Sequence, residues 1–204
     1  MERVIKTFKK FDATASTIIK NFDEVSKKIH ENYIGGTYET EYAKAKELYD
    51  EAMAQAREEA LAAIREAFAD MNAKIQNFVM QPAPADFIST LEAIKTMGAT
   101  VTEQEGALYF EKYRSNYMAG RAIANYLQEM KKYFFRVPSY DEIKADLASL
   151  ENQAEDFIRK YKMNSYTTKL FTLEERNPWA KEAEKLQKFL AGDVSAVAVP
   201  IENK

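Results

Sequence analysis

Apolar residues recur along the first part of the chain in alternating steps of four and three. The stripe runs from Val4 to Ile29, and this heptad spacing keeps one side of a helix against a partner helix. Gly35 and Gly36 follow it, and glycine adopts the left-handed cap conformation without a Cβ clash. The pattern therefore predicts a first amphipathic helix that ends near Ile34 and packs on another helix.

A second stripe with the same spacing extends over residues 37–80 and is rich in alanine. A helix of this length would be about 60 Å long, more than a compact domain of this size needs. The long helix must therefore protrude or form the spine of an elongated bundle. Its alanines allow a neighbouring backbone to approach closely.

Prolines and glycines mark where the following elements begin and end. Pro82 and Pro84 interrupt the long helix, because proline has no backbone N–H to donate. Residues 87–97 then have the pattern of a short helix, and Gly98 ends it. These breaks are too weak to assign a domain boundary.

Two capping boxes mark the starts of later helices, and the first is formed by Thr102 and Glu105. From Thr102 we predict one helix to about residue 135, with a new start at residues 115–116 as an alternative. Ser139 and Glu142 form the second capping box, and a third heptad stripe follows over residues 140–161.

The last part of the chain changes in character. Asn177 and Pro178 have the types expected at a helix start, so residues 179–190 are predicted to be helical, with Gly192 as their end. The following tail is β-branched and is the only strand-like segment of the sequence. Its apolar residues are Val194, Val197, Val199 and Ile201.

Composition supports a helical fold. The chain has 204 residues, 46% of them hydrophobic and 30% charged, and only 6 glycines and 5 prolines. We predict an all-α fold, an elongated helical bundle with a long alanine-rich central helix, heptad-type packing and a short extended C-terminal tail. We expect a single helical-bundle domain over residues 1–192 and a tail over residues 193–204.

Charge and cysteine content narrow the classes of function. The formal net charge of −3 gives no overall attraction to polyanions, and no apolar run is long enough to span a membrane. The start of the chain lacks the apolar block of a secretory signal, so we expect a cytoplasmic protein. The absence of cysteine excludes disulfides, thiolate metal sites and a cysteine nucleophile.

No motif for catalysis is present. His30 is the only histidine, which excludes the paired Glu-x-x-His sites of ferritin-like bundles, and no phosphate-binding glycine loop occurs. Glu47 and Asp50 have the spacing of a carboxylate pair for magnesium, although no second pair faces them. We therefore expect a non-enzymatic protein without cofactor or metal, and a magnesium-dependent enzyme on this acidic face is a further alternative.

Residues 107–136 combine many aromatic residues with basic ones. On a helical wheel the apolar residues cover a broad arc, which indicates a buried central helix, and the basic residues gather opposite it. Arg114, Arg121 and Lys132 form this predicted basic ridge. The tyrosines at the margins of the arc are candidate partner or subunit contacts: Tyr113, Tyr117, Tyr126 and Tyr133.

Charge is also segregated between the first two helices. Glu39 to Asp70 holds nine acidic residues and four basic ones, whereas one acidic residue accompanies four basic ones at the start of the chain: Arg3, Lys6, Lys9 and Lys10. These opposite charges can pair within one chain or between copies. An amphipathic basic start can also lie on an anionic membrane, but the continuing heptad favours helix packing.

From these features we expect a protein–protein interaction or assembly protein and a homo-oligomer, because the long helix would otherwise expose apolar surface. In general character the chain is similar to small helical structural or accessory proteins of phages and other mobile elements. The tail residues Val197, Val199 and Ile201 are further candidate contacts, and a deletion after Gly192 is expected to weaken assembly.

The alternative is a nucleic-acid-binding regulator. It would use the basic N-terminus together with the predicted basic ridge of Arg114, Arg121 and Lys132, and its binding would weaken steeply with salt.

Overall fold

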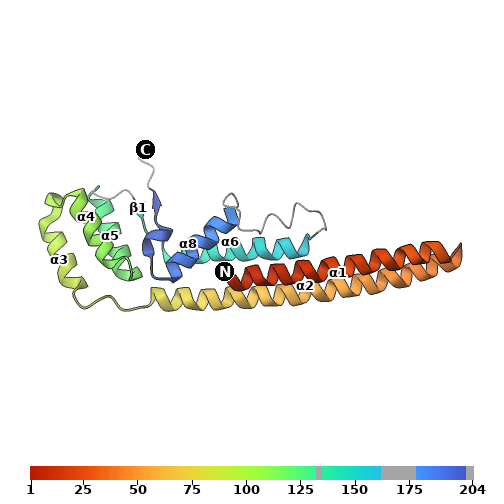
Figure 1. The fold of residues 1–204 in the computed structure, drawn as a ribbon. Coiled ribbons are helices and arrows are strands. Elements are labelled where there is room, and N and C mark those ends of the chain that lie inside the picture. The colour runs from red at the N-terminus through yellow and green to blue at the C-terminus, as the bar shows by residue number, and fades with distance from the viewer. Residues whose placement is uncertain (132–134, 162–177, 201–204) are drawn as a thin grey trace. The chain divides into compact units, whose positions relative to one another are not determined.

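The computed structural model describes residues 1–131, 135–161 and 178–200, and it confirms the all-α fold (Figure 1). The α-helices are α1 (Glu2–Asn32), α2 (Gly36–Val79), α3 (Phe87–Met97), α4 (Glu103–Tyr113), α5 (Tyr117–Glu129), α6 (Tyr140–Arg159) and α8 (Pro178–Leu190). Two single turns of 3₁₀-helix are η1 (Gly98–Thr100) and η2 (Val194–Val197). The two-residue strands β1 (Phe135–Arg136) and β2 (Val199–Pro200) pair antiparallel.

Both predicted capping boxes form, which explains why the starts of α4 and α6 could be located from the sequence. The Thr102 side chain accepts a hydrogen bond from the Glu105 N–H, and the Glu105 carboxylate accepts one from the Thr102 N–H. Ser139 and Glu142 make the same reciprocal pair. The Ser139 N–H, together with Arg136, lowers the pKa of Glu142 to about 2.

One prediction about this region is wrong: the continuous helix from Thr102 to about residue 135 is two helices. α4 ends at Tyr113, and Asn116 caps a new helix by accepting a hydrogen bond from the Ala119 N–H at 3.0 Å. The Asn116 side-chain amide also donates to the Pro82 carbonyl at 2.9 Å. The alternative start at residues 115–116 is thus confirmed, because the buried asparagine has partners only in the broken form.

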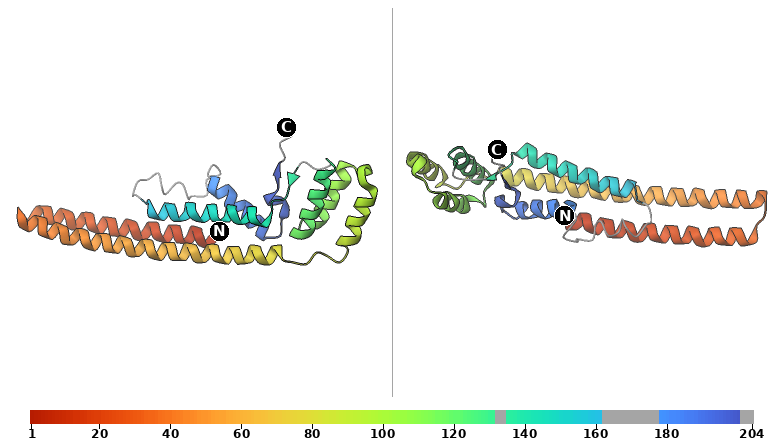
Figure 2. Two further views of the ribbon diagram at one scale, coloured as in Figure 1. Left: turned by 180° about the vertical axis from the view of Figure 1, so that it is seen from behind. Right: turned by 90° about the horizontal axis from the view of Figure 1, so that it is seen from above.

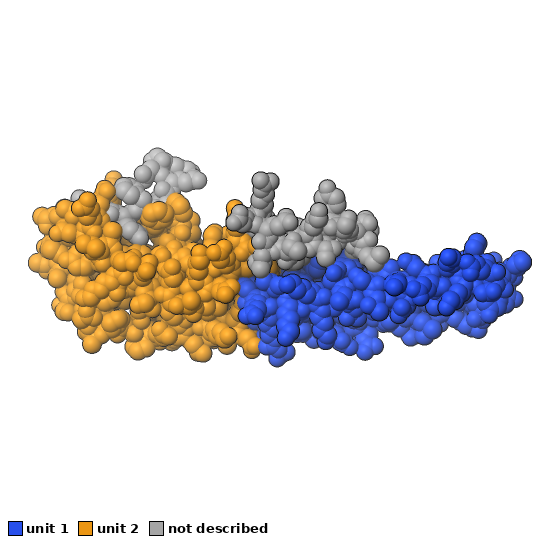
Figure 3. Space-filling model, in the orientation of Figure 1, with its two compact units in different colours: residues 1–68, 151–177 blue, residues 69–150, 178–204 orange. Residues whose placement is uncertain are grey.

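The contacts divide the chain into two compact units (Figure 3). Unit 1 comprises Met1–Phe68 and Glu151–Asn177, and unit 2 comprises Ala69–Leu150 and Pro178–Lys204. The single helical-bundle domain over residues 1–192 stays a prediction.

Unit 1 is built on a helical hairpin in which α1 and the first part of α2 lie antiparallel and side by side (Figures 1 and 2). The last part of α6 packs on this hairpin through edge-to-face aromatic pairs. The Phe8 and Phe157 ring centroids are 5.2 Å apart, and those of Phe11 and Tyr161 are 5.0 Å apart. These pairs form because the heptad stripes of α1 and α6 face each other here.

Unit 2 is built around the ring of Phe189 on α8, which is fully buried. It lies edge-on to Phe78 at 4.9 Å and to Tyr117 at 5.8 Å between ring centroids. The only tryptophan, Trp179, donates its indole N–H to the Leu150 carbonyl at 3.2 Å.

The described part of the predicted C-terminal tail also packs within unit 2. Val194 is fully buried, and its N–H donates to the Arg114 carbonyl at 2.9 Å. The residues that follow pair with β1, with Phe135 opposite Pro200 and Arg136 opposite Val199. Residues 193–200 therefore belong to the core and edge of this unit, and they do not extend freely from it.

Candidate functional site

An apolar groove that is open to solvent lies between α1 and α2 of unit 1. The part of the groove nearer the α1–α2 loop is lined by Ile18, Asn21, Phe22 and Val25 of α1 and by Ala45, Leu48, Tyr49 and Ala52 of α2. Leu48 is 68% exposed and Val25 is 43% exposed, so the groove opens to solvent. Asn21 is the one residue among these eight whose side chain is neither apolar nor aromatic.

A second hollow continues this groove toward the N-terminus of α1. It is lined by Thr7, Lys10, Phe11 and Thr14 of α1 and by Ala56, Glu59, Ala60 and Ala63 of α2. Because residues seven apart lie on one line along a helix, the two hollows share one face of the hairpin. We call this continuous face the hairpin groove. Its α2 side is floored largely by alanine.

The hairpin groove is open because two helices alone cannot cover the whole apolar stripe of each. On α1, Ala15 is buried, and Ile29 is the only buried residue beyond it. Phe22, between them, packs against the rings of Tyr49 at 4.7 Å and Tyr42 at 5.9 Å between centroids and remains half-buried. Between Ala15 and Ile29 the apolar stripe of α1 therefore continues, but the residues packed around it leave it partly exposed.

α6 packs on the other face of the hairpin. Phe8 of α1 meets Phe157 of α6, and Asp12 meets Tyr161 just after it, about 120° around the helix from the centre of the groove lining. Phe11 lies between, because it lines the groove and also contacts Tyr161. Tyr161 donates its hydroxyl to Asp12, and burial together with this carboxylate raises the pKa of Tyr161 to about 12.

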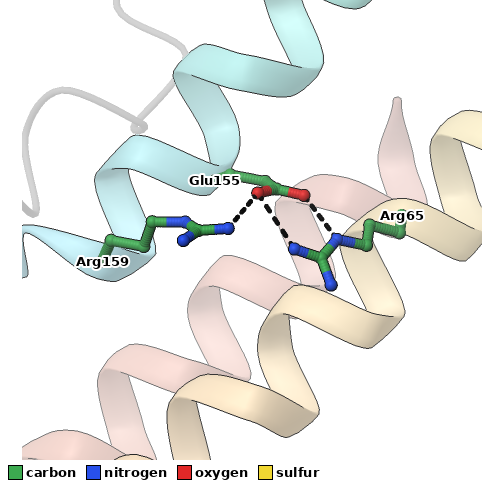
Figure 4. A network of polar contacts seen from close by, with 3 residues as sticks. All are labelled: Arg65, Glu155 and Arg159. Atoms are coloured by element: carbon green, nitrogen blue, oxygen red, sulfur yellow. Dashed lines mark hydrogen bonds and ion pairs between the residues drawn. The ribbon is translucent and has the colours of Figure 1, made fainter.

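An ion-pair cluster fixes α6 to that face (Figure 4). The Glu155 carboxylate accepts hydrogen bonds from Arg65 Nε at 2.6 Å and Arg65 Nη2 at 3.2 Å, and from Arg159 Nη2 at 2.7 Å. Glu155 is 16% exposed, and its two arginine partners are about half exposed. α6 thus has a defined position, and among the described residues the groove is the face of the hairpin that stays open.

The predicted basic N-terminus lies along α1, where Arg3, Lys6, Lys9 and Lys10 are all exposed. Arg3 forms an ion pair with Glu66 of α2 at 2.7 Å. At this point the opposite charges of the first two helices pair within one chain. Lys10 and Glu59 both line the end of the hairpin groove that is nearer the N-terminus of α1.

The predicted tyrosine contacts lie in unit 2, and two of them are buried. Tyr113 is 2% exposed and donates its hydroxyl to Asp86 at 2.9 Å, while Tyr117 is 3% exposed and donates to the Pro138 carbonyl at 2.9 Å. Burial raises the pKa of Tyr117. Tyr126 is half-buried, and Tyr133 lies outside the described residues. The break between α4 and α5 places the rings of Tyr113 and Tyr117 inward.

The remaining predicted contacts are dispersed over unit 2. Val197 is half-buried in η2, Val199 is 41% exposed in β2, and Ile201 lies outside the described residues. Arg114 is exposed and paired with Glu111 at 3.0 Å.

The other members of the predicted basic ridge are Arg121 and Lys132. Arg121 is half-buried, with its guanidinium 6.0 Å from the Tyr117 ring centre, and Lys132 lies outside the described residues. Arg114 ends α4 and Arg121 belongs to α5, so the predicted ridge does not run along one helix.

Glu47 and Asp50, the candidate magnesium pair, are both exposed on α2. Within residues 1–131, 135–161 and 178–200, no three histidine or acidic side chains gather in an arrangement that could hold a metal ion. The described helices also include none with the length and apolar character needed to cross a membrane.

Sequence reasoning found the stripes that line the hairpin groove but not the groove itself. Heptad spacing shows that a helix has an apolar side, whereas the groove exists because α6 packs on another face of the hairpin and no other described element covers it. The nearest signal in the sequence was the run of alanines on α2. No protein-family model, no curated protein and no solved structure matches this chain.

Proposed function

We propose that this chain is a non-enzymatic assembly protein that associates with a second copy of itself through the hairpin groove. The observation that carries the proposal is the exposed apolar lining, above all Leu48 and Val25, on a face flanked by charged residues. Contiguous apolar surface of this kind, rimmed by polar residues, is typical of protein interaction sites.

The energetics favour association over solvent exposure. Complete burial of a leucine or valine side chain contributes about 1.5–3 kcal/mol, and Leu48 and Val25 still have much of that gain available. In a symmetric pair each contribution occurs twice. The alanines of α2 add a second advantage, because a partner helix can approach closely over them.

The charges around the groove do not favour a polyanion. Glu59 and Glu66 lie on the same part of the hairpin as Lys10 and Arg3, and Arg3 is already paired with Glu66. A nucleic-acid site needs a predominantly positive surface along its length. The basic N-terminus therefore supports helix pairing better than it supports a nucleic-acid-binding regulator.

The test is the oligomeric state of the full chain, measured by sedimentation velocity over a range of concentrations. We expect a reversible dimer, and Leu48→Asp should make the chain monomeric because it places a charge in the apolar contact. The matched control is Leu108→Asp on α4, since Leu108 is 70% exposed and lies outside the groove.

Circular dichroism should show unchanged helix content in both variants. A monomeric wild-type chain at all concentrations would contradict the proposal, as would equal effects of the two substitutions. A salt-sensitive mobility shift with DNA or RNA that requires Lys6, Lys9 and Lys10 would favour the nucleic-acid alternative.

A further inference from the structure

The two sides of the hairpin groove carry opposite charge, and this determines how a second copy can fit. We infer that the second copy packs face to face with α1 along α2 of the first copy, with both α1–α2 loops at the same end. This inference rests on the proposed self-association and specifies its geometry.

The level of each charge along the hairpin is fixed by one ion pair. Arg3 and Glu66 are 2.7 Å apart, so they lie at the same height on the antiparallel helices. Seven residues further along α1, and seven back along α2, Lys10 and Glu59 line the same hollow. The same offset places Lys28 level with Glu41 near the loop.

All six side chains lie on the groove face of their helices. At 100° per residue, Arg3, Lys10 and Lys28 fall on the line of the groove residue Asn21. Glu41, Glu59 and Glu66 fall on the line of Leu48. The α1 rim is thus basic at three levels, and the α2 rim is acidic at the same three levels. Lys44 offsets part of this charge, because it pairs with Glu41 at 2.8 Å.

Two symmetric arrangements bring one hairpin groove against another. A two-fold axis parallel to the helices places α1 of each copy over α2 of the other, so Lys10 of one copy meets Glu59 of the other. A two-fold axis perpendicular to the helices within the groove plane places α1 over α1 and α2 over α2. In that arrangement, centred on the same contact, Arg3 would lie near Lys28 of the other copy, and Glu66 near its Glu41.

Unlike charges attract and like charges repel, so the parallel axis is favoured. Both arrangements make every neighbouring pair of helices antiparallel, as in an up-down four-helix bundle, so the charges decide between them. The contact from Arg3 to Lys28 is about 38 Å long and about 20 Å wide, from the rise and diameter of a helix. That is about 750 Å² per copy, close to the roughly 800 Å² per partner of a stable interface.

The first test uses two charge-reversed chains, Lys10→Glu and Glu59→Lys. Each alone would place like charges together twice in its dimer, and we expect its dissociation constant to rise about tenfold. In an equimolar mixture the mixed dimer has two attractive pairs, because each altered residue meets its opposite in the other chain. Sedimentation equilibrium of the mixture should therefore recover wild-type affinity.

Recovery on mixing separates contacts between copies from effects within one chain, since a defect in each folded monomer would persist in the mixture. If the wild-type chain dimerises but the mixture shows no recovery, the inferred arrangement is wrong and the self-association stands. If the wild-type chain is monomeric, both the arrangement and the proposed function fail.

The second test uses the absence of cysteine from the chain. Ile34, in the loop, is 94% exposed, and Ile34→Cys should cross-link efficiently between copies under mild oxidation when both loops lie at the same end. The opposite arrangement would separate the loops by about 50 Å. Ala13→Cys, at an exposed position on the outer side of α1, is the control for random collision. Equal cross-linking of the two variants in a dimeric sample would overturn the inference.

Discussion

Among single residues, Glu155 has the most connected charged side chain of unit 1. Its carboxylate is 16% exposed and holds arginines from two helices, Arg65 of α2 and Arg159 of α6. The hydrogen bond from Arg65 is the main cause of its lowered pKa. Glu151, one turn earlier on α6, is in the opposite situation, because burial and the neighbouring Glu155 raise its pKa.

Replacing Glu155 with glutamine should destabilise the protein by about 1 kcal/mol at pH 7, the scale of a partly exposed charged hydrogen-bond pair. Because the folded-state pKa is lowered, the carboxylate stabilises the fold above its ordinary pKa of about 4.3, and the contribution is lost as pH falls through the folded-state value. The difference between wild type and Glu155→Gln, measured by urea unfolding, should therefore shrink between pH 5 and pH 3.

Glu151→Gln provides the control with the opposite sign. A raised pKa means that the folded state disfavours the charged form, so removing the charge should be neutral or stabilising at pH 7. If both variants lose the same stability at pH 7, the role assigned to the Glu155 cluster is incorrect.

Between elements, the break from α4 to α5 depends on close backbone contact. A Cβ atom at Gly120 would lie 3.1 Å from the Tyr113 carbonyl oxygen and 3.6 Å from the side chain of Val194. The glycine thus allows the start of α5 to contact the end of α4 and the buried residue of the tail. The tail then completes the core of unit 2, a role that its β-branched sequence did not indicate.

Gly120→Ala should destabilise the protein by about 1–3 kcal/mol, because a carbonyl oxygen fixed at a helix end cannot move aside easily. Gly36→Ala is the matched control: Gly36 begins α2, and a Cβ there meets no atom within 4 Å. We expect this control to be neutral or stabilising by up to about 1 kcal/mol. Thermal unfolding followed by circular dichroism measures both, and equal melting temperatures would contradict the close contact.

For the whole molecule, the proposed self-association links stability to concentration. A dimer that binds only the folded chain stabilises it by mass action, so its melting temperature rises with protein concentration. We expect this rise for the wild-type chain between micromolar and hundred-micromolar samples in scanning calorimetry. Leu48→Asp should remove the concentration dependence, whereas Leu108→Asp should keep it. A wild-type melting temperature that is independent of concentration would argue against the dimer.

Local sequence determined most of the helices. Heptad stripes, two capping boxes and a few glycines and prolines fixed α1, α2, α3, α6 and α8 to within a few residues, because each signal acts over one or two helical turns. The charge separation between the first two helices was also visible in the sequence. It reappears in the structure as the Arg3–Glu66 pair and the opposite rims of the hairpin groove.

Tertiary structure alone decided which apolar faces are covered. The wheel of residues 107–136 assumed one straight helix, and the buried Asn116 and Gly120 at the break invalidated that geometry. The hairpin groove was likewise beyond sequence reasoning. Phe157 and Glu155 of α6, with Tyr161 after it, cover one face of the hairpin, and the described residues leave the groove open. Periodicity reports that a helix has an apolar side, but burial of that side depends on contacts between residues far apart in the sequence.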